Sequence, residues 1–167
     1  MKKLTILVLI FAGIAVSASA MSFWVGPNAY YGRAITPDSV TGANVSSITL
    51  KDLAFGAEGR LYLGPLAGSI SAEYLGSKKI LLLADAGLNL KLLFFRFGLG
   101  IGPNYGIKLG GGNAALGGNL RATAEIQLGG LAAGLSWFSM VEFDKASIAE
   151  AFKSPYGFLG ATVTFRM

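Results

Sequence analysis

Residues Leu120–Leu128 read Leu-Arg-Ala-Thr-Ala-Glu-Ile-Gln-Leu, and this stretch decides the class of fold. Every even-numbered residue in it is apolar, and every odd-numbered residue is polar or charged. Successive side chains of a β-strand point to opposite faces, so the stretch is predicted to be a strand with one apolar and one polar face.

The same two-faced pattern returns along the chain and predicts an all-β protein. Short turns are indicated at Gly64-Pro65, 76–79 and Gly129-Gly130, and longer loops at Thr36–Ser47, Leu109–Gly118 and Glu142–Pro155. Strands of about 10 residues then account for the length with eight strands, whereas ten strands would need much tighter turns. The predicted strands are 22–33, 53–63, 66–75, 82–92, 95–108, 120–128, 131–141 and 156–167.

The N-terminus has the features of a secretion signal. Lys2 and Lys3 are followed by the apolar run Leu4–Val16 and by Ala18-Ser19-Ala20, a small-residue cleavage site. We therefore expect a signal peptide over residues 1–20 and one domain over residues 21–167. An uncleaved anchor is the alternative, but the apolar run is short for a span of about 20 residues.

The composition indicates a membrane protein without membrane-spanning helices. Hydrophobic residues are 53% of the sequence and charged residues 14%, against about 25% charged in an average domain. The longest charge-poor stretch, 126–141, contains Gln, Gly and Ser, which argues against a spanning helix. A closed barrel is the other structure that a bilayer permits. The net charge of +5, reduced to +3 without Lys2 and Lys3, gives no reason to expect a nucleic-acid partner.

Two kinds of barrel fit alternating strands. A lipocalin-like soluble barrel turns its apolar face inward around a ligand, whereas a transmembrane barrel turns that face toward lipid. The polar face here consists largely of Gly, Ala, Ser and Thr, as in Gly98, Gly100 and Gly102. Small residues suit the narrow interior of an eight-stranded barrel, and a water-exposed face would carry more Lys and Glu. We therefore predict a transmembrane antiparallel up-and-down β-barrel.

The charged residues of the polar face then become candidates for the barrel interior. Both signs are present, and an isolated charge in a narrow interior would be costly. Near strand ends, Lys91, Arg96, Lys108 and Arg166 are interpreted as solvated rim charges. The residues nearer mid-strand are predicted to form a structural ion-pair network that fills the lumen: Glu58, Arg60, Glu73, Asp85, Arg121 and Glu125.

Aromatic residues lie mostly toward strand ends, as expected for girdles at the two membrane interfaces. The residues that suggest such girdles are Trp24, Tyr30, Tyr31, Tyr74, Phe94, Phe95, Tyr105, Trp137, Phe138, Tyr156 and Phe165.

The last strand carries a family resemblance. Residues Leu159–Met167 alternate to the chain end and resemble the C-terminal strand of bacterial outer-membrane β-barrels, with Val163, Phe165 and Met167 as the assembly signal. That family usually ends in an aromatic residue, whereas this chain ends in Met167. The architecture as a whole resembles small OmpA/OmpX-type eight-stranded barrels. The resemblance implies outer-membrane localisation, lipid as surroundings and the barrel assembly machinery as a partner, but no particular activity.

The chain contains no histidine and no cysteine, which excludes catalysis based on either residue. A carboxylate-pair mechanism is formally possible from the acidic residues, but structural ion pairing explains them better. We expect no enzymatic activity, no cofactor and no metal site, and a structural or surface-interaction role through the loops, whose partner the sequence does not identify. The alternatives are a narrow pore for ions or small solutes and a periplasmic carrier of an apolar ligand.

Overall fold

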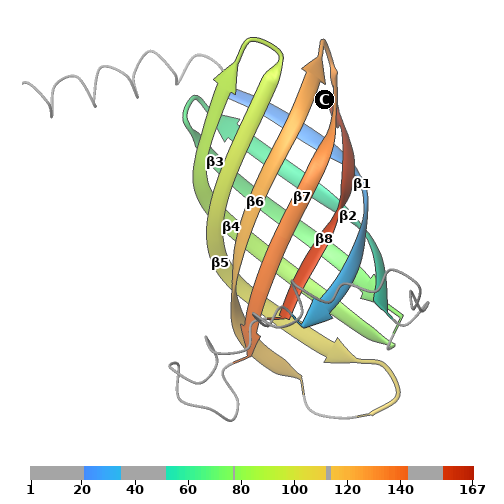
Figure 1. Cartoon of the computed structure of the whole chain (residues 1–167). Coiled ribbons are helices and arrows are strands. Elements are labelled where there is room, and N and C mark those ends of the chain that lie inside the picture. Colours follow the sequence, from blue (N-terminus) through green and yellow to red (C-terminus); the bar gives the residue numbers. More distant parts are fainter. Residues whose placement is uncertain (1–20, 35–51, 77, 112–113, 143–155) are drawn as a thin grey trace, which may run out of the picture.

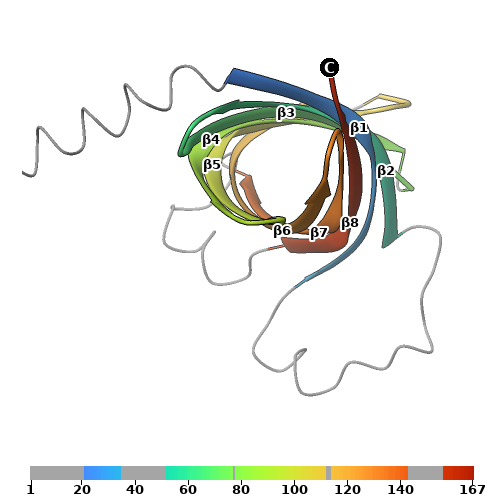
Figure 2. The same ribbon diagram turned by 90° about the horizontal axis from the view of Figure 1, so that it is seen from above.

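The structure is a closed antiparallel barrel of eight strands (Figures 1 and 2). It is a computed structural model that describes residues 21–34, 52–76, 78–111, 114–142 and 156–167. Each strand pairs with its neighbours in sequence, and β1 closes the barrel by pairing with β8. The strands are β1 Met21–Ala34, β2 Leu53–Leu63, β3 Leu66–Leu75, β4 Lys79–Leu92, β5 Phe95–Lys108, β6 Ala115–Leu128, β7 Leu131–Glu142 and β8 Tyr156–Arg166. The eight-stranded prediction is confirmed, and the ten-stranded alternative is wrong.

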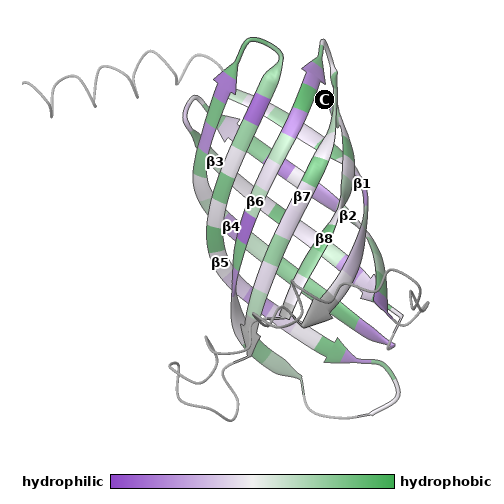
Figure 3. Cartoon of the chain, in the orientation of Figure 1, coloured by the Kyte–Doolittle hydropathy of each residue, from purple (hydrophilic) through white to green (hydrophobic). Residues whose placement is uncertain are grey.

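The alternation along each strand separates the inside of the barrel from the outside. In β6, Arg121 and Glu125 are 4% and 2% exposed, whereas Leu120 and Ile126 are 40% and 47% exposed. Figure 3 shows the resulting mixture of hydrophobic and hydrophilic positions along the strands. Large apolar side chains therefore cover the outer surface, and charged side chains are buried inside. No helix in the described part of the chain is long and apolar enough to cross a membrane.

Strand β4 begins three residues earlier than the sequence analysis predicted. Lys79 already pairs with Leu75 and Lys108, so the turn ends at Lys78 rather than at Lys79. Lys78 adopts a positive φ of 59°, and its amide donates to the Leu75 carbonyl over 3.0 Å. The tighter turn is possible because Lys78 takes the left-handed conformation that glycine usually provides.

Strand β6 begins at Ala115, so the predicted loop Leu109–Gly118 is too long. Gly117 pairs with Asn104 of β5 and with Glu142 of β7, and Gly118 pairs with Pro103 and Val141. The prediction was wrong because glycine was interpreted as a loop signal, whereas pairing on both sides holds these glycines within the sheet.

The connections at the two ends of the barrel differ in kind. The two-residue turns after β2, β4 and β6 lie at the end that also carries the C-terminus (Figure 1). All four connections at the opposite end pass through residues that the structure does not describe. The expected signal peptide 1–20, loop Thr36–Ser47 and nearly all of loop Glu142–Pro155 lie outside the described residues. Glu142 itself is the last residue of β7.

Candidate functional site: the packed interior of the barrel

Glu58 on β2 lies at the centre of a group of charged side chains that crosses the lumen. Its carboxylate accepts from Arg60 Nη2 over 2.5 Å and from Arg121 Nη1 over 2.8 Å. Thr162 on β8 donates its hydroxyl to the same carboxylate. The Glu58 side chain is 0% exposed, so both ion pairs are shielded from water. Because the partners come from β2, β6 and β8, these contacts connect strands on different sides of the barrel.

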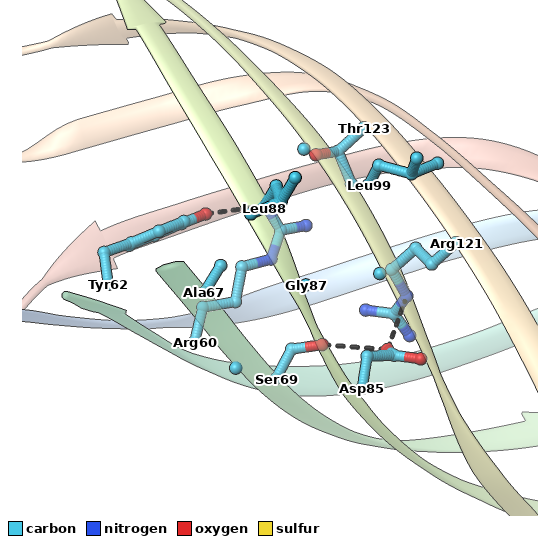
Figure 4. Close-up of a pocket in the computed structure, with 13 residues that line it drawn as sticks. Arg60, Tyr62, Ala67, Ser69, Asp85, Gly87, Leu88, Leu99, Arg121 and Thr123 are labelled. Carbon is cyan, nitrogen blue, oxygen red and sulfur yellow. Dashed lines mark hydrogen bonds and ion pairs between the residues drawn. The ribbon is translucent and has the colours of Figure 1, made fainter. Parts of the chain in front are cut away.

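Arg121 extends the group of charges toward β3 and β4. Its Nε lies 3.1 Å from Asp85 Oδ2, and its Nη2 donates to Ser71 Oγ over 2.9 Å. Asp85 also accepts from Ser69 Oγ over 2.9 Å (Figure 4) and from the Asn119 amide. Polar side chains on β2, β3 and β4 thus hold one arginine in place.

A small cavity of about 40 Å³ adjoins this group, and Arg60, Asp85 and Arg121 contribute to its lining. A space of this size holds a few water molecules at most. The interior around these residues is therefore filled mainly by side chains.

All six residues proposed for the lumenal network are buried, with exposures from 0% to 9%. Five of them form one connected group, which we call the central network: Glu58, Arg60, Asp85, Arg121 and Glu125. Glu125 enters it through an ion pair with Arg60 Nη1. Glu73 is not joined to the central network by an ion pair among the described contacts.

Glu73 instead contacts a neutral side chain. Asn28 Nδ2 on β1 donates to Glu73 Oε1 over 2.8 Å, and Glu73 Oε2 has no hydrogen-bond partner among the described residues. The carboxyl group lies directly over Gly56 on β2, where a Cβ would overlap Oε2 and lie 2.7 Å from Cδ. The glycine thus leaves the space that this side chain occupies.

Replacing Glu73 and Glu58 by glutamine is expected to have different effects. Glu73→Gln keeps the shape and a hydrogen-bond acceptor for Asn28, so the free energy of unfolding should change by less than about 1 kcal/mol. Glu58→Gln removes the charge that two buried arginines share and should lower it by about 2 kcal/mol or more. Urea titration of the folded barrel in detergent measures both. A larger loss for Glu73→Gln than for Glu58→Gln would contradict the placement of Glu58 at the centre.

An apolar layer lies inside the barrel toward the end opposite the two-residue turns. Phe138 stacks on Phe158 at 4.6 Å between ring centroids and meets Tyr30 edge-on at 4.9 Å. Buried Leu81 and Leu83 of β4 belong to the same cluster. The sequence analysis missed this layer. The signal for it was the run Ile80–Leu83, where apolar residues occupy both faces of the strand.

Arg96 lies between two aromatic rings toward the turn end. Its guanidinium carbon is 4.8 Å from the centroid of Trp24 and 4.0 Å from that of Tyr62, and Nη2 donates to Gln127 Oε1 over 2.6 Å. Arg96 is 4% exposed, so its interpretation as a solvated rim charge was wrong. The cation–π contacts account for its burial, since aromatic faces attract a desolvated guanidinium.

The aromatic girdle prediction also needs a correction. Trp24, Tyr30 and Phe138 are 1%, 1% and 0% exposed, and they fill the interior rather than the outer surface. Tyr74, Phe94, Phe95, Tyr105 and Phe165 are exposed, as predicted. Position along a strand does not distinguish these two groups, because the face on which a side chain lies depends on the parity of its position.

The interior thus has three layers: apolar at one end, charged in the centre and cationic–aromatic at the turn end. The acidic side chains of the central network point to arginines, and no group of three or more potential metal ligands occurs among the described residues. The residues proposed as the C-terminal signal lie outside the barrel, where Val163, Phe165 and Met167 are 37%, 51% and 78% exposed.

Solved structures with this architecture include eight-stranded barrels of outer membranes. The N-terminal β-barrel domain of Pseudomonas aeruginosa OprF is similar with a TM-score of 0.59 and 13% identity, over 86% of this chain and 97% of that one. Neisserial surface protein A is similar with a TM-score of 0.54 and 13% identity, over 89% of this chain and 99% of that one. No protein-family model and no curated protein sequence matches the chain. At these identities the likeness shows the fold alone.

Proposed function

We propose that the chain is an integral β-barrel of a bacterial outer membrane, with a structural or surface-interaction role and a lumen closed by its own side chains. The observation that carries the proposal is the distribution of polarity: Leu99, Ile101 and Leu135 are 56%, 69% and 61% exposed, while Glu58 and Arg121 are buried. Such an outer surface is stable in lipid and would aggregate in water.

This distribution argues against the carrier alternative. A lipocalin-like barrel would line its interior with apolar side chains to hold an apolar ligand. Here the centre of the lumen holds Glu58, Arg60 and Arg121, and the cavity beside them has a volume of only about 40 Å³. The polarity is therefore the reverse of what that alternative requires.

The layered interior also favours a closed barrel over a pore. Phe138 and Phe158 stack across one end of the lumen, and the central network fills the middle. Conduction through an eight-stranded barrel would require these side chains to rearrange. A non-catalytic role is part of the proposal, supported by the absence of histidine and cysteine from the sequence and by the engagement of Glu58 and Asp85 with arginine.

We further propose outer-membrane lipid and the barrel assembly machinery as partners. The assembly signal would need a row of exposed apolar side chains at the C-terminus. This row consists of Val163 and Phe165 on the outer face of β8, together with Met167. Contacts with molecules outside the cell would involve the segments 36–47, 109–114 and 143–155, which connect the strands at the end opposite the two-residue turns.

Cell fractionation of the full chain tests the proposal. We expect the protein in the outer-membrane fraction, with faster gel migration before boiling than after it, because a barrel with all backbone groups paired resists detergent. Purified protein in a planar bilayer should give no steady unit conductance. Recovery in the soluble periplasmic fraction without detergent would support the carrier, and a reproducible conductance from monomer would support the pore.

A further inference from the structure

The three two-residue turns at one end of the barrel share a backbone feature but not a composition. The first residue of each has a positive φ: 60° at Gly64, 56° at Leu93 and 60° at Gly129. Glycine adopts this conformation without penalty, whereas a Cβ makes it unfavourable. The turn between β4 and β5 therefore places leucine where the other two turns place glycine.

Contacts between Leu93 and the barrel do little to offset this conformational cost. Leu93 is 86% exposed, and the next residue, Phe94, is 47% exposed. The turn is nonetheless well anchored, because the Gln127 amide on β6 donates to the Phe94 carbonyl over 2.6 Å and Leu92 pairs with Phe95. A fixed turn thus exposes two large apolar side chains, of which Phe94 packs on the neighbouring Phe95 ring.

We propose that the Leu93–Phe94 turn inserts into the lipid leaflet at the turn end of the barrel and anchors that end. This inference rests on the proposed membrane location. It adds that the side chains of this turn, unlike those of the other two, reach the apolar edge of the membrane rather than water. Figure 3 shows hydrophobic residues continuing around the tip of the β4–β5 hairpin.

The apolar outer surface of the barrel continues onto the turn, which identifies lipid as the partner that the turn contacts. Leu92 and Phe95, on either side of the turn, are 53% and 41% exposed. From Phe95 to Ile107 a tilted strand rises about 30 Å, more than the roughly 25 Å apolar band of a transmembrane barrel. The turn therefore lies at the edge of the band, where its side chains reach the boundary between acyl chains and headgroups.

Charges at the same end complement a lipid surface. Lys91, next to Leu92, is exposed, and so is Arg166 at the end of β8. Cations at this level can contact lipid phosphates while the turn contacts acyl chains. A protein partner in water would not require apolar and cationic side chains in a site that continues directly from the lipid-facing surface.

Site-directed spin labelling tests the insertion, since the chain has no cysteine to interfere. Single variants Leu93→Cys, Gly130→Cys and Leu99→Cys are labelled in the full chain and refolded into phosphatidylethanolamine–phosphatidylglycerol vesicles. Gly130 is the matched turn control, because a Cβ there would meet nothing nearer than Arg166 Cβ at 3.9 Å. Leu99, 56% exposed within β5, is the lipid control. Unboiled gel migration verifies that each variant is folded.

Collision with oxygen and with a charged nickel chelate reports the depth of each label. We expect the ratio of oxygen to nickel accessibility to be roughly tenfold higher at position 93 than at position 130, because the chelate is excluded from hydrocarbon. A label at 93 that behaves like the label at 130, with the label at 99 in lipid, would overturn the insertion and leave the membrane proposal intact. An aqueous label at 99 would instead contradict the membrane proposal. Dipolar broadening confined to position 93 would show that a second copy of the chain covers the turn, which also overturns lipid insertion.

Discussion

Arg121→Ala is expected to lower the free energy of unfolding by about 3–5 kcal/mol, the usual cost of removing one partner from a buried ion pair. The substitution leaves Glu58 without its 2.8 Å contact and Asp85 without its 3.1 Å contact, in an interior where both side chains are buried. The loss is measured by urea titration of the refolded barrel, followed by unboiled gel migration.

The control for Arg121→Ala is Arg166→Ala, which removes the same type of side chain from an exposed position at the end of β8. Exposed charges contribute about 0–1 kcal/mol, so this variant should unfold at nearly the same urea concentration as the parent protein. Equal stability of Arg121→Ala and Arg166→Ala would show that the central network does not stabilise the barrel.

Gly26→Ala is expected to prevent closure of the barrel. A Cβ at Gly26 would overlap the Val163 carbonyl oxygen and lie 2.7 Å from Thr164 Cα, at the seam where β1 pairs with β8. Backbone atoms on both strands would have to separate, and the cost should reach or exceed the roughly 1–3 kcal/mol typical of overpacked interiors. The expected result is loss of the fast-migrating, unboiled form after refolding.

Gly68→Ala on β3 provides the matched control, because the same substitution there brings Cβ no closer than 3.7 Å to the Asp85 carbonyl oxygen. This variant should refold with the same yield as the parent protein. If Gly26→Ala also refolds fully and keeps its stability, the close approach of β1 and β8 at Gly26 is not needed for closure.

Much of the fold could be predicted because its signals are local. The parity of Leu120–Leu128 assigns Arg121 and Glu125 to one face, and the structure places both inside. Failures occurred where the local signal was ambiguous. Gly117 and Gly118 suggested a loop but lie in β6, and the apolar run Ile80–Leu83 hid inward-facing Leu81 and Leu83.

The interior could be predicted only in part. The alternation of side chains along β5 placed Arg96 on the inward face, but its position near a strand end suggested a solvated rim charge. Its burial depends on Trp24, far away in sequence, which lies beside it only because β1 and β5 curve around the same lumen. Glu73 likewise meets Asn28 of β1, whereas the sequence analysis expected it to take part in ion pairs.

The sequence by itself determined the number of strands through its turn signals and its length. In clearly alternating strands such as Leu120–Leu128 it also determined the face on which each side chain lies, because a strand reverses its side chains with a period of two. Only the tertiary structure decided which side chains meet, since closure and strand tilt set the heights at which distant strands face each other. Glu58, Arg121 and Thr162 therefore share one contact group despite their separation along the chain. Closure also made Gly26 a point of close approach, because its backbone lies against that of Val163 on the last strand.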